Sequence, residues 1–194
     1  MATDFRYRQN AVKSLTNEIG VYALCDLDGV PVYVGQSKDG IRSRVARHLT
    51  SARSDIIANR QIDVWEIGWV WAYPVATKED LDPLEALLYH SFNTKSQLMN
   101  GTVPPVPTSL SELPQPSQIV QVMTDIEILA KRDPVQRLPR QAAHYAQIVG
   151  HFLEVKKSKQ IARAIAAHFQ RLARYHQTLL GIANSAAADD DEED

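Results

Sequence analysis

Cysteine is almost absent from this sequence of 194 residues, because Cys25 is the only one. A single thiol forms no internal disulfide and supplies none of the paired cysteines of a zinc-binding module. Zinc-ribbon and RING-like modules are therefore excluded for this chain. A lone cysteine is also typical of a reducing compartment.

Long apolar runs are missing as well. No stretch of 18 apolar residues occurs, and the first residues, 1–4, lead into no apolar segment. We therefore expect no membrane span, no signal peptide and a cytoplasmic location. With 44% apolar residues, the chain can still bury one good core or two modest ones.

The sequence also lacks an overall excess of one charge, since its formal net charge is −2. The charges are nevertheless unevenly placed. Residues 118–188 carry ten Lys or Arg against four Asp or Glu, and residues 189–194 are all acidic. Two interpretations stay open: a DNA-gripping region whose acidic tail competes for its basic surface, or a solvated helical bundle with a solubilising tail.

Two short strings near the N-terminus predict a hairpin. Gly20-Val21-Tyr22 and Tyr33-Val34-Gly35 flank two apolar runs that meet at Asp28-Gly29, a dipeptide typical of two-residue turns. This turn pairs Leu24 with Tyr33 and Tyr22 with Gly35, so both phenols lie on one face. Gly35 leaves room above Tyr22 for a ligand, although aromatic pairs across strands are also ordinary packing.

A basic helix is predicted directly after the hairpin, over residues 41–49. Its apolar positions recur at helical spacing, and Arg44 and His48 are four residues apart on another face. Lys38, Arg42 and Arg47 add positive charge. Such a helix is placed to hold a phosphate backbone, although a solvated basic face gives the same pattern.

A third strand and an acidic helix start follow. Alternating apolar residues predict a strand over 62–73, covered on both faces and ended by Pro74. Asp82-Pro83-Leu84-Glu85 then reads as a helix start. Glu85 therefore has two interpretations, a capping-box partner or a metal-binding carboxylate.

Together these motifs resemble the GIY-YIG nuclease family over residues 18–101. The two triplets match its signature with Val in place of Ile. Arg44 and His48 match its helix residues, Glu85 its carboxylate, and Asn100 an asparagine often found about fifteen residues later. The family often carries Lys after the second Gly, where this sequence has Gln36. If that lysine helps to activate the nucleophile, either Lys38 or another residue must do so here.

The resemblance implies hydrolysis of DNA phosphodiester bonds with one Mg²⁺ or Mn²⁺. It implies that Glu85 is the metal ligand, that Arg44 stabilises the charge of the transition state and that His48 relays a proton or contacts phosphate. Tyr22, Tyr33 and His48 stay open as general base, with Arg44, Lys38 and the metal expected to lower the pKa of Tyr22. Candidate substrate-binding residues are Gly35, Lys38, Arg42, Arg47 and Asn100.

The expected fold class is α+β. A three-stranded sheet flanked by helices occupies a nuclease-like domain over residues 1–101. A proline-rich linker over 102–117 leads to a helical region over 118–188 with helices near 118–131, 139–155 and 157–183, and an acidic tail follows over 189–194.

The leading functional hypothesis is a restriction-like, mobile-element or defence endonuclease. It has DNA as partner and a possible homodimer through residues 139–183. Two alternatives stay open: a DNA-binding module that no longer cuts, and an interaction protein that uses the nuclease fold as a scaffold. No recognition helix indicates a sequence specificity.

Overall fold

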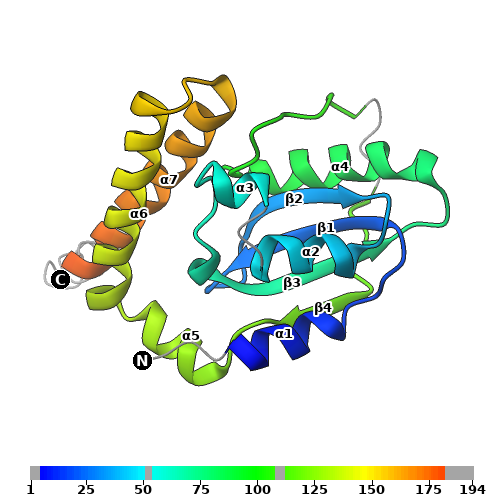
Figure 1. Cartoon of the computed structure of the whole chain (residues 1–194), viewed down its shortest axis with the longest axis horizontal. Helices are drawn as coiled ribbons and strands as arrows, with labels where there is room; N and C mark the ends of the chain where they lie inside the picture. The colour runs from blue at the N-terminus through cyan, green and yellow to red at the C-terminus, as the bar shows by residue number, and fades with distance from the viewer. Residues whose placement is uncertain (1–4, 51–53, 108–111, 182–194) are drawn as a thin grey trace, which may run out of the picture.

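The computed structural model describes residues 5–50, 54–107 and 112–181 of the chain (Figure 1). Its centre is one antiparallel sheet with strand order β2-β1-β3-β4. The strands are β1 Gly20–Asp26, β2 Pro31–Ser37, β3 Ile67–Pro74 and β4 Gln118–Gln121. The predicted α+β class is confirmed.

Helices cover both faces and one end of this sheet (Figure 1). α1 and α2 lie on one face and α4 on the other, while α6 and α7 form an antiparallel pair beyond the β1–β2 turn. None of the described helices is long and apolar enough to cross a membrane. The helices are α1 Phe5–Lys13, α2 Ile41–Thr50, α3 Asp55–Ala58, α4 Leu81–Asn93, α5 Asp125–Arg132, α6 Pro134–Glu154 and α7 Lys159–Leu180, with short 3-10 turns η1 Val64–Glu66 and η2 Lys78–Asp80.

Strand β3 is covered on both sides, as its apolar pattern predicted. Val70 and Ala72 join the core beneath α1 and α2, while Trp71 and Tyr73 face the core beneath α4. The strand starts later than residue 62 because Asp63 caps the 3-10 turn η1, its carboxylate accepting from the amide of Trp65.

The hairpin turn is one residue longer than predicted. Asp26 N–H donates to Val30 O and Gly29 adopts φ +76°, which closes a three-residue loop instead of the Asp28-Gly29 turn. A register irregularity after Leu24 absorbs the extra residue. Leu24 therefore still pairs with Tyr33, and Tyr22 with Gly35, as expected.

The prediction of a three-stranded sheet is wrong by one strand. Residues 118–121, which were expected to begin a helix, pair antiparallel with β3 at the sheet edge. Helix α5 begins only at Asp125, where Thr124 and Glu127 form a capping box. This four-residue strand is too short to show a period of its own, so its sequence alone could not separate it from the helix that follows.

The two long C-terminal helices are confirmed with shifted bounds. Pro134 occupies the first turn of α6, where its missing N–H costs nothing, and Asp133 caps that helix. Pro139, which we expected at the helix start, lies inside α6. α7 begins after Ser158, whose hydroxyl accepts from the amide of Ile161.

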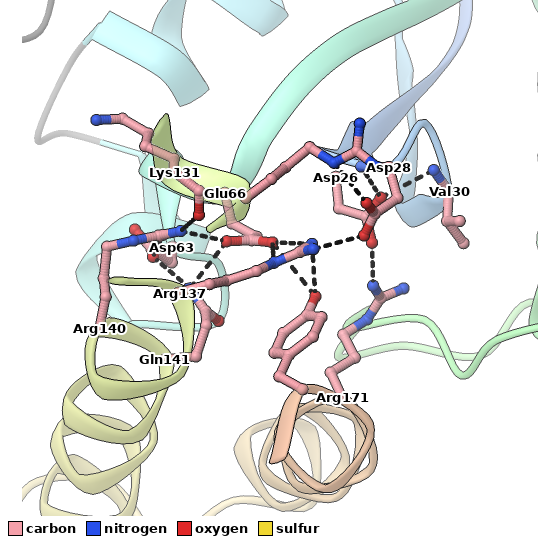
Figure 2. A network of polar contacts seen from close by, with 12 residues as sticks. Asp26, Asp28, Val30, Asp63, Glu66, Lys131, Arg137, Arg140, Gln141 and Arg171 are labelled. Atoms are coloured by element: carbon pink, nitrogen blue, oxygen red, sulfur yellow. Dashed lines mark hydrogen bonds and ion pairs between the residues drawn. The ribbon is translucent and has the colours of Figure 1, made fainter. Parts of the chain in front are cut away.

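A buried polar network joins α6 and α7 to the sheet (Figure 2). Arg137 pairs with Glu66 and lies 2.6 Å from Asp28, while Arg140 bonds Asp63 at 2.8 Å and Glu66 at 2.7 Å. On α7, Arg171 pairs with Asp26 and donates to Pro31 O, and Tyr175 donates to Glu66. On α6, the side-chain amide of Gln141 donates to Asp63 and Glu66.

This network bears on the uneven charge of the sequence. Three of the basic residues of region 118–188 are used inside the molecule, against acidic side chains of the first 70 residues. These three arginines are therefore not available to bind a DNA backbone. Only the other Lys and Arg residues of this region can contribute to a basic surface. The division into domains 1–101 and 118–188 stays a prediction, although β4 and the network join the two regions.

Candidate active site

The hairpin places its two phenols side by side, as the register predicted. The rings of Tyr22 and Tyr33 lie 6.3 Å apart between centroids. The space above Gly35 is not free for a ligand, however, because a Cβ there would lie 2.6 Å from the Tyr22 hydroxyl and 2.8 Å from the Tyr33 ring. Gly35 thus permits the packing of the two phenols, and its predicted substrate contact is not what the geometry shows.

His48 of α2 completes an aromatic cluster with these phenols. Its Nε2 lies 2.7 Å from the Tyr22 hydroxyl, and its Nδ1 lies 2.6 Å from Ser54 Oγ. A neutral imidazole has one donor and one acceptor, so it can link the two hydroxyls in either direction. The arrangement forms a continuous hydrogen-bonded chain from Ser54 to Tyr22.

Burial controls protonation in this cluster. It raises the pKa of Tyr22 well above its ordinary value; Tyr33 adds to this, and Arg44 offsets only part of it. Arg44 does lower the pKa of Tyr22, as expected, but burial outweighs it, so the net shift that Arg44, Lys38 and a metal were together expected to produce is not present in the protein alone. Burial, followed by the charges of Arg44 and Arg47, lowers the pKa of His48 to about 3, so its imidazole is neutral near pH 7.

A pH-dependent stability follows from two buried histidines. Burial also lowers the pKa of His168, to about 4; this side chain is buried, and its Nε2–H donates to Gln61 O at 2.9 Å. Unfolded histidine titrates at about 6.5, so below that pH the unfolded chain binds more protons than the folded one. The stability that these two neutral histidines allow is therefore fully present above pH 6.5. It decreases as the pH falls from 6.5 toward the pKa values of His48 and His168 in the folded protein.

We expect urea unfolding to show about 2 to 4 kcal/mol less stability at pH 5 than at pH 7. His168→Gln removes about half of this difference, whereas the exposed His176→Gln leaves it unchanged. A stability that stays constant or rises between pH 7 and pH 5 would contradict the burial of neutral imidazoles.

Four of the predicted site residues line one pocket of about 560 Å³. Tyr33, Arg44, Glu85 and Asn100 all line it, although they come from β2, α2, α4 and the segment after α4. Tyr22 is fully buried beside the pocket. The charge of Arg44 lowers the pKa of its hydroxyl, and that of Glu85 raises it. The remaining walls are Ile56, Asn59, Gln61, Asp82, Gly101, Thr102, Val103, Pro104, Pro105 and Gln160.

Glu85 is not a capping residue. The capping box at this helix start belongs to Thr77 and Asp80, one turn earlier. The carboxylate of Glu85 instead accepts from Gln36 Nε2 at 2.9 Å, and the same nitrogen donates to Asp82 at 2.7 Å. Burial raises the pKa of Glu85, the amide of Gln36 opposes this, and Asp82 adds to it.

Arg44 lines the pocket and also interacts with the buried Tyr22. A side-chain hydrogen bond to Arg44 is among the interactions that lower the pKa of Tyr22. Its Nε is buried and has no hydrogen-bond partner in the part of the chain that the structure describes. The Arg44 guanidinium thus lines the pocket and carries one buried N–H for which the described residues supply no acceptor.

The other predicted substrate-binding residues have different positions. Asn100 uses its side-chain amide to bond the backbone of Val34, with its Oδ1 3.0 Å from the amide and its Nδ2 2.6 Å from the carbonyl. It therefore orders the pocket edge instead of facing a phosphate. Lys38, Arg42 and Arg47 are exposed and do not line the pocket; Arg42 lies in a separate hollow between α1 and α2.

Several wall residues were missed from the sequence. Gln36, which bonds the wall residues Asp82 and Glu85, stands where GIY-YIG nucleases often carry Lys, and these two contacts were not foreseen. The Asp82–Glu85 spacing of three residues was a usable signal, because such residues share a helix face. Nothing local signalled that residues 101–105 and Gln160 of α7 close the other side of the pocket.

No cluster of three or more His, Cys, Asp or Glu side chains within the described ranges is arranged to hold a metal ion. The carboxylates of Asp82 and Glu85 are nevertheless hard oxygen donors in one pocket, and they converge on a single N–H₂ group. No family model, curated protein or solved structure matches the chain.

Proposed function

We propose that this protein is a cytoplasmic endonuclease of GIY-YIG type that hydrolyses DNA phosphodiester bonds with Mg²⁺ or Mn²⁺. The observation that carries the proposal is the pocket itself. It gathers a phenol, a guanidinium and a carboxylate from three separate elements. These are the residue types that phosphodiester hydrolysis requires, in the order of the GIY-YIG motif.

Each residue has a distinct task in this proposal. Arg44 binds the non-bridging oxygens of the scissile phosphate and stabilises the charge that develops on them. Tyr33 lines the pocket and orients the attacking water. Tyr22 and His48 lie behind it and hold a proton chain toward Ser54.

The donor set suits a hard divalent cation. Mg²⁺ binds through one or two carboxylates and keeps several waters, which matches Glu85 with its neighbour Asp82 in a roomy pocket. The amide of Gln36 occupies the position between both carboxylates, where positive charge is favoured. When bound, such an ion supplies Lewis-acid stabilisation of the phosphate and of the leaving oxygen.

The phenol that contacts substrate in this proposal is Tyr33, since Tyr22 is fully buried. We expect Tyr33→Phe to lower the rate of DNA cleavage by about 10- to 100-fold at saturating DNA. Tyr22→Phe leaves the imidazole of His48 short of one partner, and we expect a cost of about 1 to 3 kcal/mol in stability and a smaller effect on rate. Paired rate and urea-unfolding measurements check both. The assignment is reversed if Tyr22→Phe has the larger effect on rate at equal folded fraction.

A supercoiled plasmid tests the function as a whole. We expect the protein to nick or linearise it in Mg²⁺ and to leave it intact in EDTA. A plasmid that is shifted but uncut in Mg²⁺ would favour a non-catalytic DNA-binding module, and a plasmid neither shifted nor cut would favour an interaction protein. Either result contradicts the proposal.

The proposal includes a homodimer through residues 139–183, since one site cuts one strand at a time. Exposed apolar side chains of α6 and α7 within this range are compatible with such a contact; they are Leu153, Phe169, Leu179 and Leu180. Sedimentation equilibrium checks the predicted dimer directly.

A further inference from the structure

Apart from Arg174, the Lys and Arg residues of the α6–α7 pair fall into two groups. Arg137, Arg140 and Arg171 face the sheet and are paired with acids. The second group lies at the turn between the helices and on the first turns of α7. We call it the basic turn; it consists of Lys156, Lys157, Lys159 and Arg163. All four are exposed, and none forms an ion pair within the described residues.

The basic turn adjoins the candidate active site. Gln160, which stands between its members, lines the pocket. Gly101 packs so closely there that a Cβ would lie 2.8 Å from Cβ of Gln160. Arg163 Nη1 donates to Gly101 O at 3.3 Å, and Gln160 Nε2 lies 3.5 Å from Thr102 Oγ1. These contacts fix the start of α7 at the pocket rim.

The spacing of the charges suits a phosphate backbone. Lys159 and Arg163 are four residues apart, so they share a helix face and lie about 6 Å apart along the axis. This is roughly the rise of two base pairs along one strand. The first turn of α7 carries no acid, so the positive end of its helix dipole adds to the same field.

The pocket needs such a surface outside it. Among the described residues that line it, Arg44 is the one Lys or Arg, against the two carboxylates of Asp82 and Glu85. The pocket walls alone therefore provide little electrostatic attraction for a long polyanion. Exposed cations at the rim supply the sequence-independent attraction that DNA binding requires.

We propose that the basic turn binds the DNA backbone on one side of the phosphodiester held in the pocket. The α6–α7 pair is then a fixed clamp, positioned by the buried arginine network and touching substrate only at its tip. This inference rests on the proposed nuclease function, because it takes the pocket as the place of the scissile bond.

The test measures the binding of a 20-base-pair duplex in EDTA, where no cleavage occurs, by fluorescence anisotropy at several salt concentrations. One variant carries Lys156→Gln, Lys157→Gln and Lys159→Gln. The control removes the same charge elsewhere through Arg6→Gln, Lys13→Gln and Arg174→Gln, all at exposed positions on α1 and the far part of α7. Thermal unfolding verifies that both variants are folded.

We expect the lysine variant to bind about 10- to 100-fold more weakly at low salt, and the slope of log K against log[salt] to shrink by about 2 to 3. The control variant keeps most of the affinity and a slope near that of the wild type. Equal salt slopes for the lysine variant and the control variant overturn the inference. So does a lysine variant that binds RNA of the same length more weakly than the wild type but binds duplex DNA equally well. If the lysine variant loses slope while the wild type never cuts plasmid in Mg²⁺, the proposed function fails and the binding surface stands. If the wild type cuts but the lysines have no effect on binding, the inference fails alone.

Discussion

Glu85→Gln is expected to reduce plasmid cleavage by about 1,000-fold or more while the protein stays folded. The carboxylate lies in the pocket with Arg44 and Tyr33, and it is the residue to which the resemblance assigns the metal. In the proposed function, removing its charge would weaken a metal interaction worth several kcal/mol in the transition state, and each 1.4 kcal/mol is tenfold in rate. The glutamine side chain keeps an acceptor for Gln36, so the local hydrogen bonding survives.

Glu79→Gln is the matched control, because Glu79 is an exposed acid in η2 just before the same helix. Initial cleavage rates at several Mg²⁺ concentrations compare the two variants with the wild type. Similar rates for Glu85→Gln and Glu79→Gln would place the chemistry elsewhere. A Glu85→Gln rate that is restored by excess Mg²⁺ instead assigns the effect to metal affinity.

Arg137→Ala is expected to destabilise the protein by about 3 to 5 kcal/mol, because it leaves buried carboxylate charge partly unpaired. The Arg137 side chain is 7% exposed and pairs with Glu66 and Asp28. It also donates to Tyr175 Oη at 3.0 Å and stacks on that ring at 4.0 Å. Burial raises the pKa of Glu66 despite the opposing arginines, so the loss of one of them matters.

Arg132→Ala separates this effect from ordinary surface charge. Arg132 bonds the same Asp28 at 3.0 Å, but its side chain is 51% exposed, so we expect a cost of about 1 kcal/mol or less. Urea unfolding followed by tryptophan fluorescence measures both. If Arg137→Ala does not fold, Arg137→Lys gives an intermediate value. Equal, small costs for Arg132→Ala and Arg137→Ala would show that the network contributes little to the docking of α6 and α7.

Local rules predicted the parts of the fold that short sequence separations determine. The hairpin register, helix α2 and the covered strand β3 follow from alternation, from turn residues and from helical spacing. The loop of the hairpin was wrong by one residue, yet the pairing of Tyr22 with Gly35 survived because an irregularity after Leu24 compensated. Register depends on which face is buried, and that pattern was visible.

Contacts over long separations were not accessible in the same way. From the sequence, the arginines of α6 and α7 were interpreted as unpaired positive charge. The acidic residues with which they pair are far away in the sequence, so no local pattern indicates these ion pairs. Gln160 enters the pocket wall about 75 residues after Glu85, through packing against Gly101. The burial that raises the pKa of Tyr22 is likewise a property of the assembled core and not of its neighbours in sequence.

Crystals soaked in Mn²⁺ give the most direct test of the central claim, which is that residues from three separate elements form one metal-dependent site. We expect an anomalous difference peak in the pocket, within coordinating distance of the Glu85 carboxylate and near Arg44 and Tyr33. A peak bound at other carboxylates, or no peak at an Mn²⁺ concentration that supports plasmid cleavage, would contradict it.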